Sequence, residues 1–421
     1  MTKRFLTLFL FSACFAAFPP LLCRADDDVT NKLEDLGIPH KERFPDGEKA
    51  YARNIWDMIS YQGRIYLGCG AYDNVPPAAN AGPVPVIAWD TETNSFVTEE
   101  NRLPDEQLDN FKVFSDGLLY APGIDPRQGW DLGNFYRRNA DGKWEVVRTM
   151  PKGVHNFDMT EFDNKIFSCG YGIAISENRG KTMLLRELGL ERVRTYVFLR
   201  FPERLFSARI FAFEQNGEEF FAEMNVYVPE KKDFDAIKIS SEDLFPGLSK
   251  TFRLPEDFKP KPDQKPFFGA FIRRTFEFQN RVLYSVGSRD GFFLYSAENP
   301  EGNRFNTARI PLPENTKPED LYVHEDALYL LTSTANLKPG ETLKPGEIPE
   351  FINQVWMSTD GIHFEPLFHF RAPLFARSFA ISGSDFYFGL GTHYKRDPQT
   401  GKWDGTPISS DCGRIYRFRM P

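Results

Sequence analysis

The chain has 421 residues, of which 26% are charged, and its formal net charge is −8. This acidic balance excludes the basic surface that a nucleic-acid-binding protein needs, so nucleic acid is not an expected partner. Aromatic residues make up 15% of the chain, and Gly and Pro contribute 31 residues each, which is typical of many short strands joined by turns.

Residues 1–25 are predicted to be a secretory signal peptide. A basic pair at positions 3 and 4 precedes the apolar run 5–18, and Ala25 ends a suitable cleavage site. Pro19 and Pro20 interrupt the run, so it is too short for a membrane span, and an uncleaved anchor is the alternative. After removal of the signal no segment is apolar enough to cross a membrane. We therefore expect a secreted protein, either periplasmic or extracellular.

One phrase recurs seven times along residues 26–421. It consists of a hydrophobic strand, a tight polar turn and a second strand centred on an aromatic residue. The intervals between copies run from 39 to 78 residues, and strand repeats of this length are typical of β-propeller blades. The sequence thus predicts a single all-β domain, a seven-bladed β-propeller of antiparallel four-stranded blades, with six or eight blades as alternatives. The copies centre on Tyr66, Tyr120, Phe167, Phe206, Tyr284, Tyr329 and Phe386.

A third and a fourth strand can be placed after most copies, for example at 83–90 and 95–100 in the first blade. The fourth blade carries a long insertion that extends to Lys265. The seventh has only three clear strands before the chain ends. We expect its fourth strand to come from residues 29–42, because such closure removes the exposed sheet edges.

Three cysteines, Cys69, Cys169 and Cys412, lie outside the predicted signal, so at most one disulfide can form. Buried free thiols are the expected state, and a Cys69–Cys412 pair is the alternative. Asp73, Asp125 and Asp290 follow second strands and could offer oxygen ligands to calcium. No compact calcium loop surrounds them, so we interpret them as turn residues and expect no cofactor.

Two turns between third and fourth strands carry a recognisable motif. Residues 176–182 (Ser-Glu-Asn-Arg-Gly-Lys-Thr) and 358–364 (Ser-Thr-Asp-Gly-Ile-His-Phe) resemble the aspartate box, or BNR repeat, of sialidase-like propellers. In that motif the Asp or Asn side chain accepts hydrogen bonds from turn N–H groups, and the glycine takes a positive φ. The resemblance implies a propeller fold and assigns no catalytic role.

The resemblance does not extend to a complete sialidase site. Sialidases use three arginines, an acid/base carboxylate and a tyrosine–glutamate pair on six blades, whereas this chain shows seven copies. The early Arg-Ile-Pro motif of that family is absent near the N-terminus. The triplet Arg309-Ile310-Pro311 occurs instead in a late outer strand, so its family role is not carried over and a true sialidase is not expected.

The starts of the inner strands are polar in every copy. In a propeller these starts open on the same face as the loops between second and third strands, which are long here. Arginine side chains grip carboxylates, sulfates or phosphates in a two-pronged fashion. We therefore predict a site for an anionic or polyhydroxylated ligand, most simply a carbohydrate, at the channel mouth. The candidate ligand-binding residues are Arg53, Asn54, His155, Arg194, Arg274 and Arg377.

Asp57 and Asp158 both lie nine residues before the aromatic centre of their copy. With His155 they are the candidate catalytic residues, because paired carboxylates or a histidine can carry protons. Two hypotheses stay open: a module that binds a carbohydrate or a protein partner, and a carbohydrate-active hydrolase or lyase. The alternative for each residue is a structural role at a strand end, with some arranged as Arg–Asp pairs.

Overall fold

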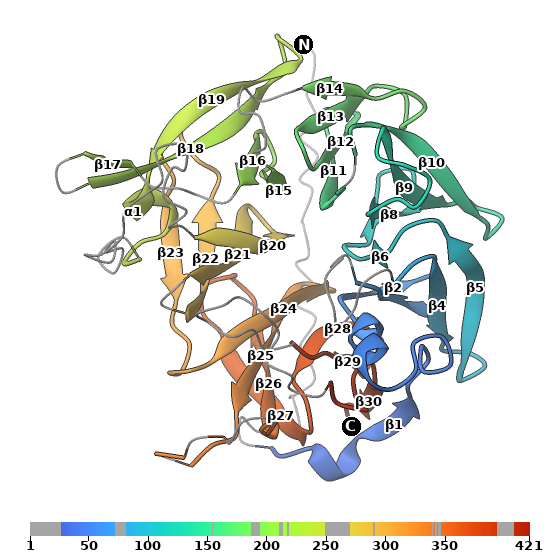
Figure 1. The fold of residues 1–421 in the computed structure, drawn as a ribbon. Helices are drawn as coiled ribbons and strands as arrows, with labels where there is room; N and C mark the ends of the chain where they lie inside the picture. The colour runs from blue at the N-terminus through green and yellow to red at the C-terminus, as the bar shows by residue number, and fades with distance from the viewer. Residues whose placement is uncertain are drawn as a thin grey trace, which may run out of the picture.

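Seven small antiparallel sheets stand in a ring around a central axis (Figure 1). The computed structural model describes residues 27–421 except 72–80, 154, 187–193, 210–213, 217–218, 249–269, 289–290, 339, 342, 344–346 and 394–407. The predicted signal peptide lies outside the described residues. The chain is thus a seven-bladed β-propeller, which confirms the predicted fold class and blade number.

The first four blades follow one another in chain order. The first blade consists of β2 (Asp57–Tyr61), β3 (Arg64–Gly68), β4 (Val84–Asp90) and β5 (Ser95–Leu103). The second consists of β6 (Gln107–Leu108), β7 (Lys112–Val113), β8 (Leu119–Ile124), β9 (Leu132–Arg138) and β10 (Trp144–Pro151). The third consists of β11 (Asp158–Phe162), β12 (Lys165–Cys169), β13 (Ile173–Ser176) and β14 (Leu184–Arg186). The fourth consists of β15 (Thr195–Arg200), β16 (Leu205–Arg209), β17 (Glu214–Asn216), β18 (Glu219–Val228) and β19 (Asp233–Ser240), followed by α1 (Ser241–Leu244).

The last three blades complete the ring. The fifth consists of β20 (Phe271–Phe278), β21 (Arg281–Ser288), β22 (Gly291–Glu298) and β23 (Thr307–Ile310). The sixth consists of β24 (Lys317–His324), β25 (Ala327–Ala335), β26 (Phe351–Ser358) and β27 (Glu365–Ala372). The seventh consists of β28 (Ala376–Ser382), β29 (Asp385–Leu390), β30 (Ile415–Arg419) and β1 (Glu34–Gly37). Two short 3-10 helices, η1 (Thr30–Lys32) and η2 (Glu48–Arg53), lie on either side of β1.

The N-terminal segment closes the ring. Strand β1 pairs antiparallel with β30, so the blue strand β1 and the dark red C-terminal strand lie side by side in Figure 1. Arg417 donates to Glu34 and Arg414 to Asp35 across this pair. The prediction that residues 29–42 supply the missing strand is confirmed, and the closure satisfies the backbone groups of an edge that would otherwise be open.

The aromatic centres of the repeat pack between neighbouring sheets. Six of the seven are at most 1% exposed, and Tyr329 is 9% exposed. Several of the rings meet side chains of a neighbouring blade: Tyr66 contacts Phe111 and Trp144 of the second blade, and Phe167 contacts Phe198 of the fourth. Burial of a large aromatic side chain contributes about 2 kcal/mol or more, so the repeat supplies hydrophobic contacts between blades.

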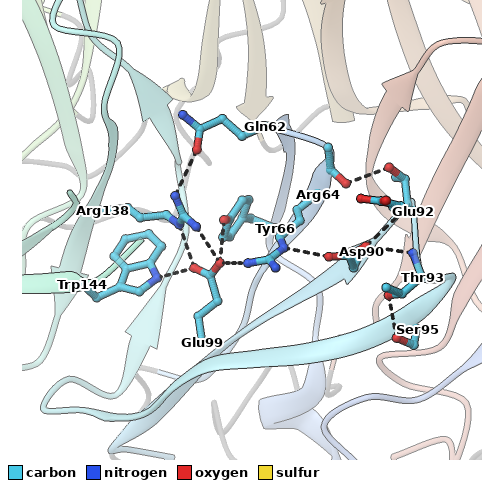
Figure 2. Close-up of polar contacts among 12 residues, drawn as sticks. Gln62, Arg64, Tyr66, Asp90, Glu92, Thr93, Ser95, Glu99, Arg138 and Trp144 are labelled. Atoms are coloured by element: carbon cyan, nitrogen blue, oxygen red, sulfur yellow. Dashed lines mark hydrogen bonds and ion pairs between the residues drawn. The ribbon is translucent and has the colours of Figure 1, made fainter. Parts of the chain in front are cut away.

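A polar network joins the first blade to the second on the side away from the channel (Figure 2). The carboxylate of Glu99 on β5 accepts hydrogen bonds from Arg138 Nε at 2.9 Å, Trp144 Nε1 at 2.9 Å and the Tyr66 hydroxyl at 3.0 Å. Arg64 also donates to it. The side chain of Glu99 is 7% exposed, so this carboxylate is buried with its acceptor capacity filled.

The two turns that resemble aspartate boxes have the expected internal hydrogen bonds. Asn178 Oδ1 accepts from Thr182 N at 2.9 Å, and Asp360 Oδ1 accepts from Ile362 N and His363 N at 2.8 Å. Gly180 and Gly361 have φ values of +83° and +72°, a region that glycine enters without strain. Both turns lie on the face opposite the inner-strand starts, and their role in this chain is to link strands.

Cys69, Cys169 and Cys412 are free and buried, so the expected thiol state is confirmed and the alternative Cys69–Cys412 pair is not formed. Burial raises the pKa of the Cys69 and Cys412 thiols to about 12, which keeps them protonated at neutral pH.

Candidate functional site

Four consecutive blades carry an extra residue near the start of the inner strand. The pairing register of the first and second strands shifts between Thr195 and Val197, Ile272 and Arg274, Pro318 and Asp320, and Ala376 and Ser378. A β-bulge of this kind bends the strand locally and changes the direction of a side chain. The inserted residues are Tyr196, Arg273, Glu319 and Arg377. All four lie near the starts of inner strands, on the face that the sequence indicates for a site, which we call the mouth.

Three of these bulge residues belong to what we call the mouth cluster. It joins the fifth, sixth and seventh blades and contains Arg273, Lys317, Glu319, Phe375, Arg377 and His393, bordered by Trp56 and Phe292. Its centre is the ring of Phe375. Lys317 Nζ lies 4.7 Å and the Arg377 guanidinium 5.2 Å from the centroid of that ring, and the His393 ring stacks on it at 4.9 Å.

Arg377 is held tightly but without a carboxylate partner. Its guanidinium stacks on Trp56 at 4.2 Å, and Nη2 donates to Thr392 O at 3.1 Å and lies 3.2 Å from His393 Nδ1. The residue is 4% exposed, and no ion pair joins it to any acid in the described part of the chain. Gly391 makes room for it, because an added Cβ there would lie 2.5 Å from Nε. A buried cation without a counter-ion is costly, so an anion is the natural complement here.

Lys317 has one acidic partner and several cationic neighbours. Its Nζ donates to both oxygens of Glu319, at 2.8 and 2.7 Å, and lies 3.3 Å from His393 Nε2. Glu319 also accepts from the Ser333 hydroxyl at 2.6 Å. Burial, opposed by Glu319 and reinforced by Arg273 and Arg377, lowers the pKa of Lys317 to about 8. Desolvation by the surrounding protein, together with the positive charges of Arg377, Lys317 and Arg273, lowers the pKa of His393 well below its ordinary value, although the residue is exposed.

Deeper in the channel, Arg274 bridges two aspartates. Its Nη1 donates to Asp57 Oδ1 at 2.9 Å and to Asp320 Oδ1 at 2.7 Å, and its Nη2 donates to Trp56 O. The structure therefore brings two predicted site residues, Asp57 and Arg274, into one ion-pair network. The positive charge of Arg274 offsets the negative charge of Asp57. This is the Arg–Asp pairing that we expect if these residues have a structural role at the strand ends.

The channel aspartates also link neighbouring blades through the backbone. Asp57 Oδ2 accepts from Phe111 N at 2.5 Å, Asp158 Oδ2 from Phe198 N at 2.9 Å, and Asp320 Oδ2 from Phe379 N at 3.1 Å. In each case the carboxylate lies on the inner strand of one blade, and the N–H group belongs to the next blade, on its inner strand or, for Phe111, directly before it. Asp158 also accepts from Lys112 Nζ at 2.6 Å and Asn110 Nδ2 at 2.8 Å. Both predicted catalytic aspartates thus have filled structural hydrogen bonds.

A second group at the mouth, the acidic cluster, lies between the first and third blades and consists of Asp105, Glu106, Asp125 and His155. His155 Nδ1 lies 2.8 Å from Asp125 Oδ1, and the ring stacks on Phe157, which in turn stacks on Tyr196. Burial, together with the nearby charge of Asp125, raises the pKa of Asp105 and of Glu106 to about 7. Asp125 has a φ of +58°, consistent with its predicted turn role, whereas Asp73 and Asp290 lie outside the described residues.

The remaining predicted residues lie elsewhere. Arg53 is fully buried at the end of η2, where its guanidinium donates to Cys412 O at 2.9 Å, Ser410 O at 2.8 Å and Asp46 Oδ1 at 3.0 Å. Asn54 is also buried and accepts from Thr392 N at 2.6 Å. Arg194 lies over the Tyr171 ring at 5.5 Å. Arg53 and Asn54 therefore fix the segments that border the mouth cluster, while Arg377 is the predicted residue that belongs to it.

Several residues of these groups were absent from the sequence prediction. Asp320 lies nine residues before Tyr329, the spacing already noted for Asp57 and Asp158, so that signal could have found it. Glu319 lies beside Asp320 at a polar inner-strand start but was not chosen as a candidate, and Arg273, Lys317 and His393 had no comparable signal. The bulges shift the register by one residue, and repeat alignment from the aromatic centres cannot detect that shift.

No protein-family profile and no curated protein matches the sequence. Solved structures with a similar fold include virginiamycin B lyase from Staphylococcus aureus, with 10% identity, coverage of 92% of this chain and 99% of that chain, and a TM-score of 0.48. The propeller domain of the Trilobed protease from Pyrococcus furiosus has 8% identity, coverage of 84% and 93%, and a TM-score of 0.41. The WD40 propeller domain of Doa1 has 8% identity, coverage of 86% and 92%, and a TM-score of 0.40. All three are β-propellers, and no activity is transferred from them.

Within the ranges given above, no three His, Cys, Asp or Glu side chains are arranged to hold a metal ion. In the same ranges no helix is both long and apolar enough to cross a membrane.

Proposed function

We propose that this propeller binds an anionic ligand at the mouth cluster, and that the ligand is a carboxylate-bearing sugar or a small organic acid. The observation that carries the proposal is Arg377, a buried guanidinium held between Trp56 and Phe375 with no carboxylate partner among the described residues. Lys317 and Arg273 add positive charge beside it. The aromatic rings around these cations offer flat apolar surfaces, a combination that suits a ring-shaped or planar anionic compound.

Secretion and kinship with sialidase-like propellers belong to the same proposal. The signal-like residues 1–25 support an extracytoplasmic location, where acidic glycans and their breakdown products occur. The two box-like turns support the kinship. Neither observation identifies the ligand. A protein partner that binds the same face is part of the same proposal.

An enzymatic role is the second candidate, and the acidic cluster favours it. Asp105 and Glu106 have pKa values near 7, raised chiefly by burial, and such carboxyls can donate protons at neutral pH. They lie on the same face as the mouth cluster. A hydrolase or lyase acting on an acidic glycan would use the mouth cluster to hold the substrate and the acidic cluster to move protons.

The test is calorimetric titration of the purified protein with acidic and neutral glycans, uronic acids and simple carboxylates, with product analysis of the same mixtures. We expect acidic compounds alone to bind, and Arg377→Met to weaken binding at least about tenfold, or ~1.4 kcal/mol. Arg371→Met is the matched control, because Arg371 is half exposed on an outer strand. Equal affinity of Arg377→Met and wild type, or no binding of any acid, would overturn the proposal. Turnover that Glu106→Gln abolishes would establish the enzymatic candidate.

A further inference from the structure

The amine of Lys317 occupies an environment unlike that of an ordinary surface lysine. Its side chain is 14% exposed, and Nζ lies between the rings of Phe292 and Phe375, at 5.1 and 4.7 Å from their centroids. Glu319 contacts Nζ through both carboxylate oxygens, and His393 lies on its other side at 3.3 Å. A lysine that is desolvated beside other cations keeps part of its amine neutral near pH 7, which is what nucleophilic attack requires.

Arg377 lies close to this amine. Lys317 Nζ contacts one ring nitrogen of His393, and Arg377 Nη2 contacts the other, at 3.2 Å, while both cations lie over Phe375. A single short molecule can therefore place a carboxylate against Arg377 and a second functional group against Lys317. The partner groups that would carry protons, Glu319 and His393, lie against the same amine.

We propose that Lys317 is a nucleophile that condenses with the carbonyl group of a short oxo acid whose carboxylate is held by Arg377. The inference rests on the proposed function, since it assigns the ligand class of that same site. In this reaction the ammonium of Lys317 gives a proton to Glu319, and the neutral amine attacks the carbonyl carbon. The carbonyl oxygen then takes up two protons, one returned by Glu319 and one from the nitrogen, and leaves as water.

The product is an iminium with the same charge as the original ammonium. The C=O bond is replaced by a C=N bond, one water is released, and neither oxidation nor reduction occurs. Glu319 therefore still faces a cation, and the positive nitrogen stays between two aromatic faces that favour it. The surroundings that stabilise Lys317 thus also stabilise its iminium.

The test is reductive trapping with cyanoborohydride at pH 7, followed by peptide mapping of the full-length protein. Pyruvate is the probe, acetaldehyde is the carbonyl control without a carboxylate, and lactate is the carboxylate control without a carbonyl. We expect pyruvate to label Lys317 at least about tenfold faster than Lys143, whose side chain is 81% exposed. Arg377→Met should lower pyruvate labelling to the level given by acetaldehyde, and Arg371→Met should not.

The dependence on pH separates a reactive amine from one that is merely accessible. The rate at Lys317 should rise to its half-maximum near pH 8, because burial, Arg273 and Arg377 lower its pKa against the opposing effect of Glu319. At this pH His393 is neutral, because its pKa is lowered. Glu319→Gln should move the half-maximum to lower pH, because Glu319 raises the pKa of Lys317. Uniform labelling of all lysines, or labelling that ignores Arg377, would overturn the inference. If lactate binds in an Arg377-dependent way but Lys317 is not trapped, the condensation at Lys317 is wrong and the proposed binding of anions stands. If lactate does not bind either, both the condensation and the proposed binding function are wrong.

Discussion

At the scale of single residues, the channel shows how a buried arginine can serve the fold. Arg274 donates hydrogen bonds to Asp57 and Asp320 at once, and each aspartate in turn accepts a hydrogen bond from a backbone N–H group of the next blade. The arginine thus supports two buried carboxylates, one of which links the first blade to the second while the other links the sixth blade to the seventh. Arg377, by contrast, contacts neutral groups only in the described structure, and this difference separates a structural arginine from a candidate ligand-binding one.

Replacement of Arg274 should be costly. Arg274→Met leaves Asp57 and Asp320 buried without a cation, so we expect the free energy of unfolding to fall by about 3 kcal/mol or more. Urea denaturation followed by tryptophan fluorescence measures the change. Arg371→Met, which removes an exposed ion pair with Asp28, should change stability by less than about 1 kcal/mol. Combining Arg274→Met with Asp57→Asn and Asp320→Asn should recover part of the loss. If Arg274→Met is as stable as the wild type, the ion pairs of Arg274 with Asp57 and Asp320 make no net contribution to the free energy of unfolding.

At the scale of elements, strand register decides which residues reach the mouth. The seven-copy repeat, the buried aromatic centres and the closing N-terminal strand follow from hydrophobic pattern and turn residues, so they could be predicted. Of the mouth cluster only Arg377 was predicted as a ligand-binding residue, because the bulges change side-chain directions without leaving a pattern in the sequence. Arg53 looked equivalent to Arg377 by position. It lies instead in a 3-10 helix, and its guanidinium points to loop carbonyls.

The network around Glu99 tests how two blades hold together. Glu99→Gln preserves the size of the side chain but leaves Arg64 and Arg138 without their shared carboxylate. We therefore expect the free energy of unfolding to fall by about 3 kcal/mol at pH 7. Glu145→Gln is the matched control, because Glu145 pairs with Arg137 at the surface of the same region and should cost less than about 1 kcal/mol.

The same variant has a predicted pH dependence. Burial alone would raise the pKa of Glu99, but hydrogen bonds from Arg138 and Trp144 outweigh it and the pKa lies below the ordinary 4.5. A lowered folded-state pKa means that the stabilisation is fully present above about pH 4.5 and is lost as the pH falls through the folded value. Thermal unfolding of wild type and Glu99→Gln should therefore differ most at neutral pH and converge in acid. A difference that stays constant down to low pH would rule out the charge as its cause.

At the scale of the whole molecule, the propeller depends on a contact between the two ends of the chain. Each blade packs mainly on its two neighbours, so an open ring would leave both the seventh blade and the sheet edge at β30 incomplete. The N-terminal segment prevents this in two places. Val29 is fully buried beside the sixth blade, where Val29 N donates to His369 O at 2.9 Å, and β1 then pairs with β30.

Removal of residues 27–37 should weaken the ring as a whole, including the mouth cluster that the sixth and seventh blades carry. The truncated protein loses the pairing of β1 and the ion pairs of Arg414 and Arg417, so we expect its Tm to fall by about 5 °C or more and its tendency to aggregate to rise. Differential scanning calorimetry and light scattering measure both effects. A synthetic peptide of residues 27–42 added in trans should restore the Tm in a concentration-dependent way, because it binds only the folded ring. A scrambled peptide should not. An unchanged Tm after truncation would mean that the three remaining strands of the seventh blade are sufficient to hold the ring.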